Sequence, residues 1–285
     1  MPSILKSFLQ YAIYYPLMIF VCLEIALRIL GYQHYQNDDY KVVSTPVNAF
    51  IGDPQMGIAL NPGIYQIQLN EGLTFQTTHL ENGTRLVKNR KNDTLQVLIL
   101  GCSFTYGYGV DDEEHFSSLL QADFPDLGLQ NAGVIGYGTL QSWMQLQEIL
   151  ETNPPETVLL HFSSYHFMRN TLSPQYRSNL KIGYQRSSQH IDNLMQSARF
   201  PYQLNCSDTI AYAHWTDMYD SWPGRDWLAA VNWIQTTKDQ AAEDIAPQLA
   251  VTTCVMEEMQ TLCNQKGVTF GVVCLDETAE TISLK

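Results

Sequence analysis

A serine that closely follows a short apolar run is the residue of this sequence best placed for chemistry. Residues 96–100 (Gln-Val-Leu-Ile-Leu) carry no charge, as expected for a strand buried on both faces, and Ser103 comes shortly after them. Parallel α/β sheets place their sites at the carboxyl ends of the strands. A hydroxyl there could act as a nucleophile, with backbone amides stabilising an oxyanion. Ordinary turns also contain glycine and serine, so this segment alone establishes no function.

Three segments in order resemble the conserved blocks of the SGNH/GDSL hydrolases. Residues 101–105 (Gly-Cys-Ser-Phe-Thr) resemble the first block, GDS(F/Y)T. Residues 131–139 (Asn-Ala-Gly-Val-Ile-Gly-Tyr-Gly-Thr) look like the second block, and residues 162–170 stand where the third is expected. The resemblance covers roughly residues 83–275. It implies a flavodoxin-like, three-layer α/β/α fold with a mainly parallel sheet, and an ester hydrolase or acyl-transfer activity.

The resemblance also implies roles for individual residues. Ser103 would attack an ester carbonyl, with its own amide contributing to the oxyanion hole, and Gly136 would supply a second amide. The third block of the family carries an asparagine as a further donor, but Tyr165 and His166 stand at the matching positions here. We therefore group His166 with the catalytic residues, and Tyr165 and Asn170 with the substrate-binding ones. A histidine that only satisfies the loop backbone is an equally good interpretation of His166.

The sequence departs from the family at two further places. Cys102 replaces an aspartate that is not the triad acid, and we expect its side chain to be buried at the strand end. More seriously, no Asp-x-x-His motif follows the last expected strand, since no histidine occurs after His214 and Asp276 has no partner at the right spacing. Either the chain is truncated before its closing strand and helix, or the domain is a non-catalytic relative. We expect truncation, because the edge of the sheet also looks incomplete.

Strand and helix patterns alternate regularly around the three blocks. This alternation predicts an α/β fold with a parallel sheet and helices on both faces. Residues 171–245 interrupt the rhythm, and their tryptophans predict a packed helical insertion whose aromatic side chains form a local core. The expected strands are 96–100, 128–131, 157–162 and 268–275. The expected helices are 111–124, for which Asp111 and Asp112 are candidate N-caps, 139–150 and 249–263.

The N-terminal segment has the composition of a membrane helix. Residues 8–23 are almost wholly apolar, and continuing to Leu30 supplies the length that a spanning helix needs. This extension includes Glu24 and Arg28, which are four residues apart and can pair on one helix face. A cleaved signal peptide and a buried core helix are the alternatives, but no small-x-small cleavage site follows. We expect a single-pass anchor with an extracytoplasmic, periplasmic bulk.

Composition excludes several classes of function. The net charge of −13 and the lack of a basic stripe exclude nucleic-acid binding. The six cysteines form no CxxC pair and no metal-like spacing with histidine, so we expect most of them to be buried free thiols. No P-loop, Rossmann glycine pattern or metal-ligand cluster occurs, and no cofactor or metal is expected.

The predicted organisation has three parts. Residues 1–31 form the membrane anchor, residues 32–93 a spacer and a small β-rich lead-in, and residues 94–285 an SGNH-like domain with the insertion at 171–245. Alternation at 65–69 and an Asn82–Gly83 turn predict a hairpin in the lead-in. The expected function is hydrolysis or transfer of acyl groups from a small-molecule, glycan or lipid ester. The alternative is a catalytically inactive binding or scaffolding domain tethered to the membrane.

Overall fold

The computed structural model divides the chain into two compact units. The larger, here called the sheet unit, comprises residues 39–218 and 244–285. The smaller, here called the anchor unit, comprises residues 1–38 and 219–243, so the segment 219–243 groups with the N-terminal helix. The structure describes residues 3–35, 42–69, 72–91, 94–177, 180, 197–206, 209–214, 217, 222–242 and 244–276.

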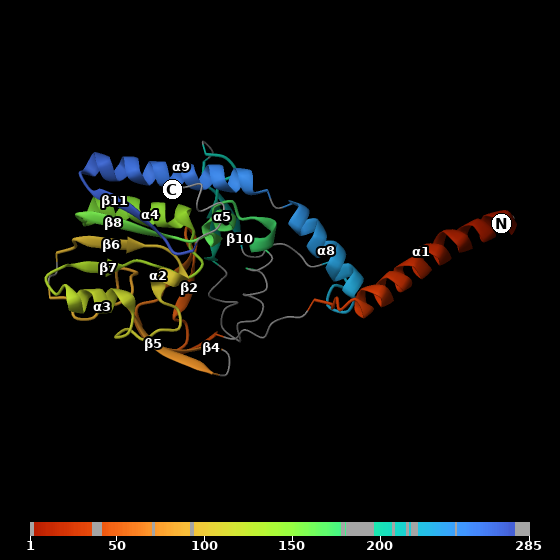
Figure 1. Cartoon of the computed structure of the whole chain (residues 1–285), viewed down its shortest axis with the longest axis horizontal. Coiled ribbons are helices and arrows are strands. Elements are labelled where there is room, and N and C mark those ends of the chain that lie inside the picture. Colours follow the sequence, from red (N-terminus) through yellow and green to blue (C-terminus); the bar gives the residue numbers. More distant parts are fainter. Residues whose placement is uncertain are drawn as a thin grey trace. The chain divides into compact units, whose positions relative to one another are not determined.

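Four parallel strands form the central sheet of the sheet unit. They are β6 (Val97–Leu100), β7 (Leu129–Asn131), β8 (Thr157–Phe162) and β11 (Thr269–Cys274). They are hydrogen-bonded in the order β11-β8-β6-β7, and each neighbouring pair is parallel (Figure 1). The four strands and the parallel α/β architecture predicted from the sequence are therefore confirmed.

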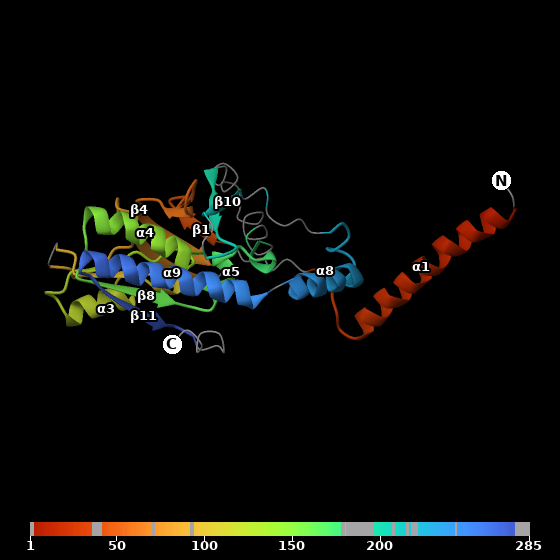
Figure 2. The ribbon, with the colours of Figure 1, turned by 90° about the horizontal axis from the view of Figure 1, so that it is seen from above.

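Helices cover both faces of this sheet. On β6, Leu98 and Leu100 pack in one cluster with residues of helices α4 (Thr139–Thr152) and α9 (Ile245–Lys266). Ile99 belongs to a different cluster, which includes Phe116 at the start of helix α3 (Phe116–Asp123). Successive residues of a strand point to opposite faces, so this division places helices on both sides. Figure 2 shows α9 running alongside β8 and β11.

Two helices begin at residues other than those predicted. Helix α3 is capped by His115, whose ring nitrogen accepts from the Ser117 amide, because the carboxylates expected to cap it bind elsewhere. Asp111 accepts from the Gln76 amide, and Asp112 binds Arg85. Helix α9 starts earlier than expected, where Asp244 accepts from the Ala246 amide at 3.0 Å.

The lead-in before the sheet is richer in strands than the sequence indicates. Strands β1 (Val42–Thr45), β4 (Gly63–Leu69) and β5 (Leu73–His79) form an antiparallel sheet in the order β1-β4-β5. Strands β2 (Phe50–Asp53) and β3 (Gly57–Leu60) form a separate hairpin. The alternating stretch 65–69 does lie in an antiparallel pair, β4–β5, but Leu69 pairs with Leu73, so Asn82–Gly83 is not the turn of this hairpin as predicted.

The segment predicted as a helical insertion contains both helix and strand. Helix α8 (Ala229–Ala242) belongs to the anchor unit, and β9 (Arg199–Tyr202) pairs with β10 (Ala211–His214) in the sheet unit. Trp215 lies outside the described residues. Cys206 forms a disulfide with Cys254, and only Cys102 and Cys263 of the six cysteines are buried free thiols, so the expectation that most of them are is wrong. Spacing along the chain could not show this pairing, because the two cysteines are separated by 48 residues.

The N-terminal helix fits the predicted anchor in length and composition. Helix α1 (Ser3–Ile29) contains the stretch Gln10–Ile29, which is long and apolar enough to cross a membrane. The predicted pairing of Glu24 and Arg28 is confirmed, with the Arg28 Nε 2.6 Å from a Glu24 carboxylate oxygen.

Candidate active site

Ser103 lies at the carboxyl end of a central strand. Strand β6 ends at Leu100, and the short helix α2 (Ser103–Tyr106) begins at the serine itself. Its side chain is half-buried, and no described residue hydrogen-bonds to its hydroxyl or to its backbone amide. Cys102, immediately before it, is fully buried as expected. The serine thus has a hydroxyl and an amide available at the sheet edge where parallel folds place their sites.

The second block packs directly on helix α2. The Asn131 side-chain amide donates to the Thr105 carbonyl at 2.8 Å, and its oxygen accepts from the Gly133 amide at 2.9 Å. A Cβ at Gly133 would lie 2.5 Å from the Tyr106 nitrogen, so only glycine permits this approach. The first two blocks therefore form one tightly packed substructure, which fixes where the chain runs after Gly133.

The Gly136 carbonyl accepts a hydrogen bond, whereas its amide has no partner among the described residues. Its φ of +78° is a conformation that glycine adopts readily. The Tyr176 hydroxyl donates to the Gly136 carbonyl at 2.9 Å, and Arg169 Nη1 donates to the Tyr137 carbonyl at 2.8 Å. No described residue accepts a hydrogen bond from the Gly136 N–H. An amide presented in this way is suited to donate to a developing oxyanion.

Tyr165 lies beside helix α2. Its ring is 48% exposed and its centroid is 6.3 Å from that of Phe104, the residue after Ser103, whose side chain is 56% exposed. The Arg169 guanidinium lies 5.6 Å from the centre of the Tyr165 ring and also holds the Tyr137 carbonyl. Helix α5 (Tyr165–Asn170) therefore connects the flank of Ser103 with the Gly136 loop.

His166 and Asn170 point into the packing between helices. The buried Asn170 side chain accepts from the Leu140 amide at 3.0 Å and donates to the Thr252 hydroxyl at 2.8 Å, which joins α5 to α4 and α9. His166 is fully buried, with its Nδ1 3.2 Å from the Thr139 hydroxyl and no described partner at Nε2. Burial, helped by the nearby Arg169, holds the pKa of His166 well below its usual value. Catalytic or substrate-binding roles for these two residues stay predictions.

The other buried histidines bind elsewhere. His115 Nε2 lies 3.1 Å from the Thr105 carbonyl, and burial lowers the pKa of His115 to about 3. His79 contacts the Asn61 carbonyl and the Tyr106 hydroxyl, and burial lowers the pKa of His79 to about 4. His190 lies outside the described residues. Within the part of the chain that the structure describes, no histidine hydrogen-bonds to Ser103.

Asp276 has a partner that sequence spacing did not reveal. Its carboxylate follows β11 and accepts from the Ser164 backbone amide, with N–O distances of 2.9 and 3.1 Å, and from the Ser164 hydroxyl. Ser164 follows β8, the neighbour of β11 in the sheet. The carboxylate thus joins the ends of two parallel strands at the edge that carries Ser103.

Arg85 joins several segments through hydrogen bonds, a structural role that its place in the sequence does not indicate. It is fully buried, and its Nε lies 2.9 Å from an Asp112 oxygen. Its other nitrogens donate to the carbonyls of Tyr106, at the end of helix α2, and of Gly107 and Val110 in the loop that follows. Burial raises the pKa of Asp112, and the Arg85 charge opposes this rise. An arginine in a polar stretch gives no sign of such burial, because most arginines lie on the surface.

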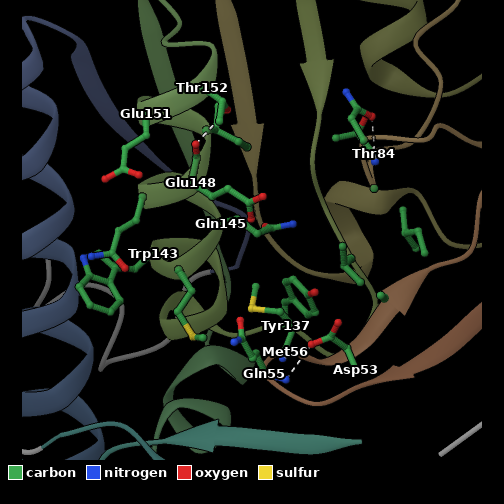
Figure 3. A pocket seen from close by; sticks show the side chains of 18 of the residues that line it. Asp53, Gln55, Met56, Thr84, Tyr137, Trp143, Gln145, Glu148, Glu151 and Thr152 are labelled. Atoms are coloured by element: carbon green, nitrogen blue, oxygen red, sulfur yellow. Dashed lines mark hydrogen bonds between the residues drawn. The ribbon is translucent and has the colours of Figure 1, made fainter. Parts of the chain in front are cut away.

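A cavity of about 870 Å³ lies beside the Gly136 loop and not at Ser103. Its lining includes Val134 and Tyr137 but no residue of helix α2. Figure 3 shows Gln145 and Glu148 of α4 on one side, and Met56 and Asp53 of the β2–β3 hairpin on the other. Among the described residues, no group of histidine, cysteine, aspartate or glutamate side chains is arranged to hold a metal ion.

Comparison with known proteins gives limited similarity. No family model and no curated protein matches the chain. Among solved structures, the chain is similar to AlinE4, described as an SGNH-hydrolase family esterase, with 27% identity and a TM-score of 0.24 over 33% of this chain and 53% of AlinE4. Two mutants of the esterase AlinE4 match with 26% and 27% identity, the same coverage and the same TM-score. The chain therefore spans about half the length of the structures it matches.

Proposed function

We propose that this chain is a membrane-anchored serine ester hydrolase or acyl-transfer enzyme of the SGNH type, with a flavodoxin-like α/β/α domain and Ser103 as nucleophile. One observation carries the proposal. The unpaired Ser103 hydroxyl lies at the carboxyl end of β6, next to a second block whose Gly136 presents an unpaired amide. The order of the three sequence blocks and their meeting at one edge of the sheet support the same conclusion.

The proposed reaction uses the serine hydroxyl and two amides. Ser103 Oγ attacks the carbonyl carbon of an acyl or acetyl ester, and its proton passes to a base. The N–H groups of Ser103 and Gly136 donate to the oxyanion of the tetrahedral intermediate. Collapse expels the alcohol and leaves an acyl-serine, which water then cleaves, or a second hydroxyl in the case of transfer. We assign the base to none of the described histidines, because none of them hydrogen-bonds to Ser103.

Exposed rings beside the nucleophile support an organic acyl substrate. Tyr165 and Phe104 lie beside Ser103 with half-exposed rings, and the Arg169 guanidinium contacts the Tyr165 ring. Such rings can cover the acyl or sugar part of a small-molecule, glycan or lipid ester. In this proposal Tyr165 contacts substrate, while Arg169 and Tyr176 position the Gly136 loop.

We place the sheet unit outside the cytoplasm, in the periplasm, with α1 in the membrane. The length and composition of α1 support the anchor. The Cys206–Cys254 disulfide supports the compartment, because disulfides persist in oxidising surroundings and are rare in the cytosol.

A tethered binding domain without catalysis is the second candidate. It is favoured by one observation, that no described histidine hydrogen-bonds to Ser103, while His79, His115 and His166 contact other groups. A serine without a base retains only the part of catalysis that comes from binding and oxyanion stabilisation.

Ester turnover by the full chain in detergent tests the proposal. The assay compares the wild type, Ser103→Ala and Ser197→Ala on p-nitrophenyl acetate and butyrate, since Ser197 is an exposed serine of the same unit. We expect Ser103→Ala to lower kcat/KM by about 1,000-fold or more and Ser197→Ala to change it by less than about twofold. Turnover that Ser103→Ala leaves unchanged contradicts the proposal, and a wild type without turnover favours the binding domain.

A further inference from the structure

A carboxylate near the end of the apolar helix α1 is neutralised by a second helix. Glu24 lies within the stretch Gln10–Ile29, where an uncompensated charge would be costly. One of its oxygens accepts from Arg28 Nε at 2.6 Å and from the Ala229 amide at 3.0 Å, and the other accepts from the Ala230 amide at 2.8 Å. The two amides belong to the first turn of α8, whose positive dipole end favours a carboxylate.

Small side chains let α8 approach α1 closely at this point. Ala229 and Ala230 are fully buried and pack with Leu27, and Phe20 and Leu23 lie against the same cluster. Immediately before α8, the Trp227 carbonyl accepts from Arg28 Nη2 at 2.7 Å. The start of α8 and the residues just before it are therefore fixed to the end of α1 by apolar packing and by three hydrogen bonds, two accepted by Glu24 and one donated by Arg28.

The start of α8 and the residues before it carry three tryptophans with exposed side chains. Trp227 is 75% exposed, and Trp222 and Trp233 are 37% and 38% exposed. Tryptophan is enriched where the membrane meets water, because its ring is apolar and its indole N–H is polar. The hydrogen bond from Arg28 to the Trp227 backbone carbonyl puts residue 227 at the end of the apolar stretch, since Arg28 is one residue before its last position, Ile29.

We propose that residues 222–234 form an interfacial collar, which binds the headgroup region of the bilayer that α1 crosses. The proposal rests on the proposed membrane anchor and adds a second lipid contact to it. A 20-residue span is about 30 Å long, matching the hydrocarbon core, and Glu24 lies about 7.5 Å before its end. The first turn of α8 binds Glu24 and so lies near the boundary of the hydrocarbon core, where it keeps the Glu24 carboxylate away from lipid. Trp227 then lies among the headgroups.

Quenching of tryptophan fluorescence by brominated lipid tests the collar. The full chain is reconstituted into phosphatidylcholine vesicles with or without bromine at the upper acyl carbons. One variant keeps only Trp227 and the matched control keeps only Trp143 of helix α4, with the remaining tryptophans changed to phenylalanine. We expect bromine to reduce Trp227 emission by about twofold or more and to leave Trp143 emission within about 10%. Equal quenching of the two overturns the collar.

A second variant tests the role of Glu24. In the Trp227-only chain, Glu24→Leu removes the acceptor for α8 but makes α1 more apolar, so membrane insertion is retained. We expect Trp227 quenching to fall towards the Trp143 level, and unchanged quenching contradicts the role of Glu24. Extraction with alkaline carbonate separates the two proposals. A wild-type chain that carbonate releases from the membrane disproves the anchor, whereas a retained chain with unquenched Trp227 disproves the collar alone.

Discussion

Two sets of polar groups surround the same edge of the sheet, and they differ in what they bind. The Ser103 hydroxyl and the Gly136 amide have no described partner, although the residues around them are tightly fixed. Arg85 and Asn170 are instead buried and use their polar atoms to join neighbouring segments. The difference indicates that the first set, the open set, is available for chemistry. The second set, the buried set, holds the open set in place.

Removal of the buried Arg85 guanidinium should have the largest effect on stability. Arg85→Met leaves the Asp112 carboxylate buried without its partner, and we expect the free energy of unfolding to fall by about 3–5 kcal/mol. The control is Lys88→Met, because the Lys88–Glu113 pair, at 3.0 Å, is largely exposed. An exposed pair contributes less than about 1 kcal/mol. Denaturant unfolding of the full chain in detergent measures both, and equal losses would contradict the structural role of Arg85.

The loop glycine should affect chemistry more than stability. Gly136→Ala strains a residue at φ +78°, although a Cβ there would lie 3.5 Å from its nearest neighbours. We expect kcat/KM for ester hydrolysis to fall about 10- to 100-fold as the amide shifts, with about 1 kcal/mol lost in stability. Gly267→Ala is the control, since Gly267 has φ +71°, no atom within 4 Å of the added Cβ, and a place at the end of α9. If both variants lose activity equally, Gly136 has no special role.

The position of the open set at the sheet edge could be predicted from the sequence, whereas the contacts of the buried set could not. Ser103 and Gly136 stand in motifs whose spacing from apolar strands fixes their place at the sheet edge. Arg85 and the Cys206–Cys254 pair depend on long-range packing, which leaves no periodic signal in the sequence. The start of α3 differs from the predicted one for the same reason, because Asp112 binds Arg85 and does not cap this helix. Strands of the parallel sheet were predictable because burial on both faces produces continuous apolar runs.

The buried histidines His79 and His115 should make the free energy of unfolding depend on pH. The pKa of His115 falls from 6.5 to about 3 on folding and that of His79 to about 4, so the unfolded chain binds more protons between these values. The contribution of these histidines to the free energy of unfolding is therefore complete above about pH 6.5. It is lost as the pH falls towards their pKa values in the folded protein, by up to about 1.4 kcal/mol per pH unit for each histidine. His115→Gln should flatten this dependence. Unfolding curves at several pH values check it, and a wild-type stability that rises on acidification contradicts it.

Replacement of His166 should have the smallest effect on catalysis. Its ring is enclosed between α5 and α4, so His166→Gln should change kcat/KM by less than about threefold, although it lowers stability. A loss of activity as large as that of Ser103→Ala would instead place His166 among the catalytic groups. The comparison of the two variants in one ester assay decides between these roles.

Covalent labelling of the full chain with a fluorophosphonate tests the central claim most directly. The probe reacts with serines that are both accessible and activated, and peptide mass spectrometry identifies the modified residue. We expect an adduct on Ser103 that is absent in Ser103→Ala, forms more slowly in Gly136→Ala and forms at an unchanged rate in Gly267→Ala. An unmodified Ser103 under conditions that label a known serine esterase would contradict a nucleophile at this edge of the sheet.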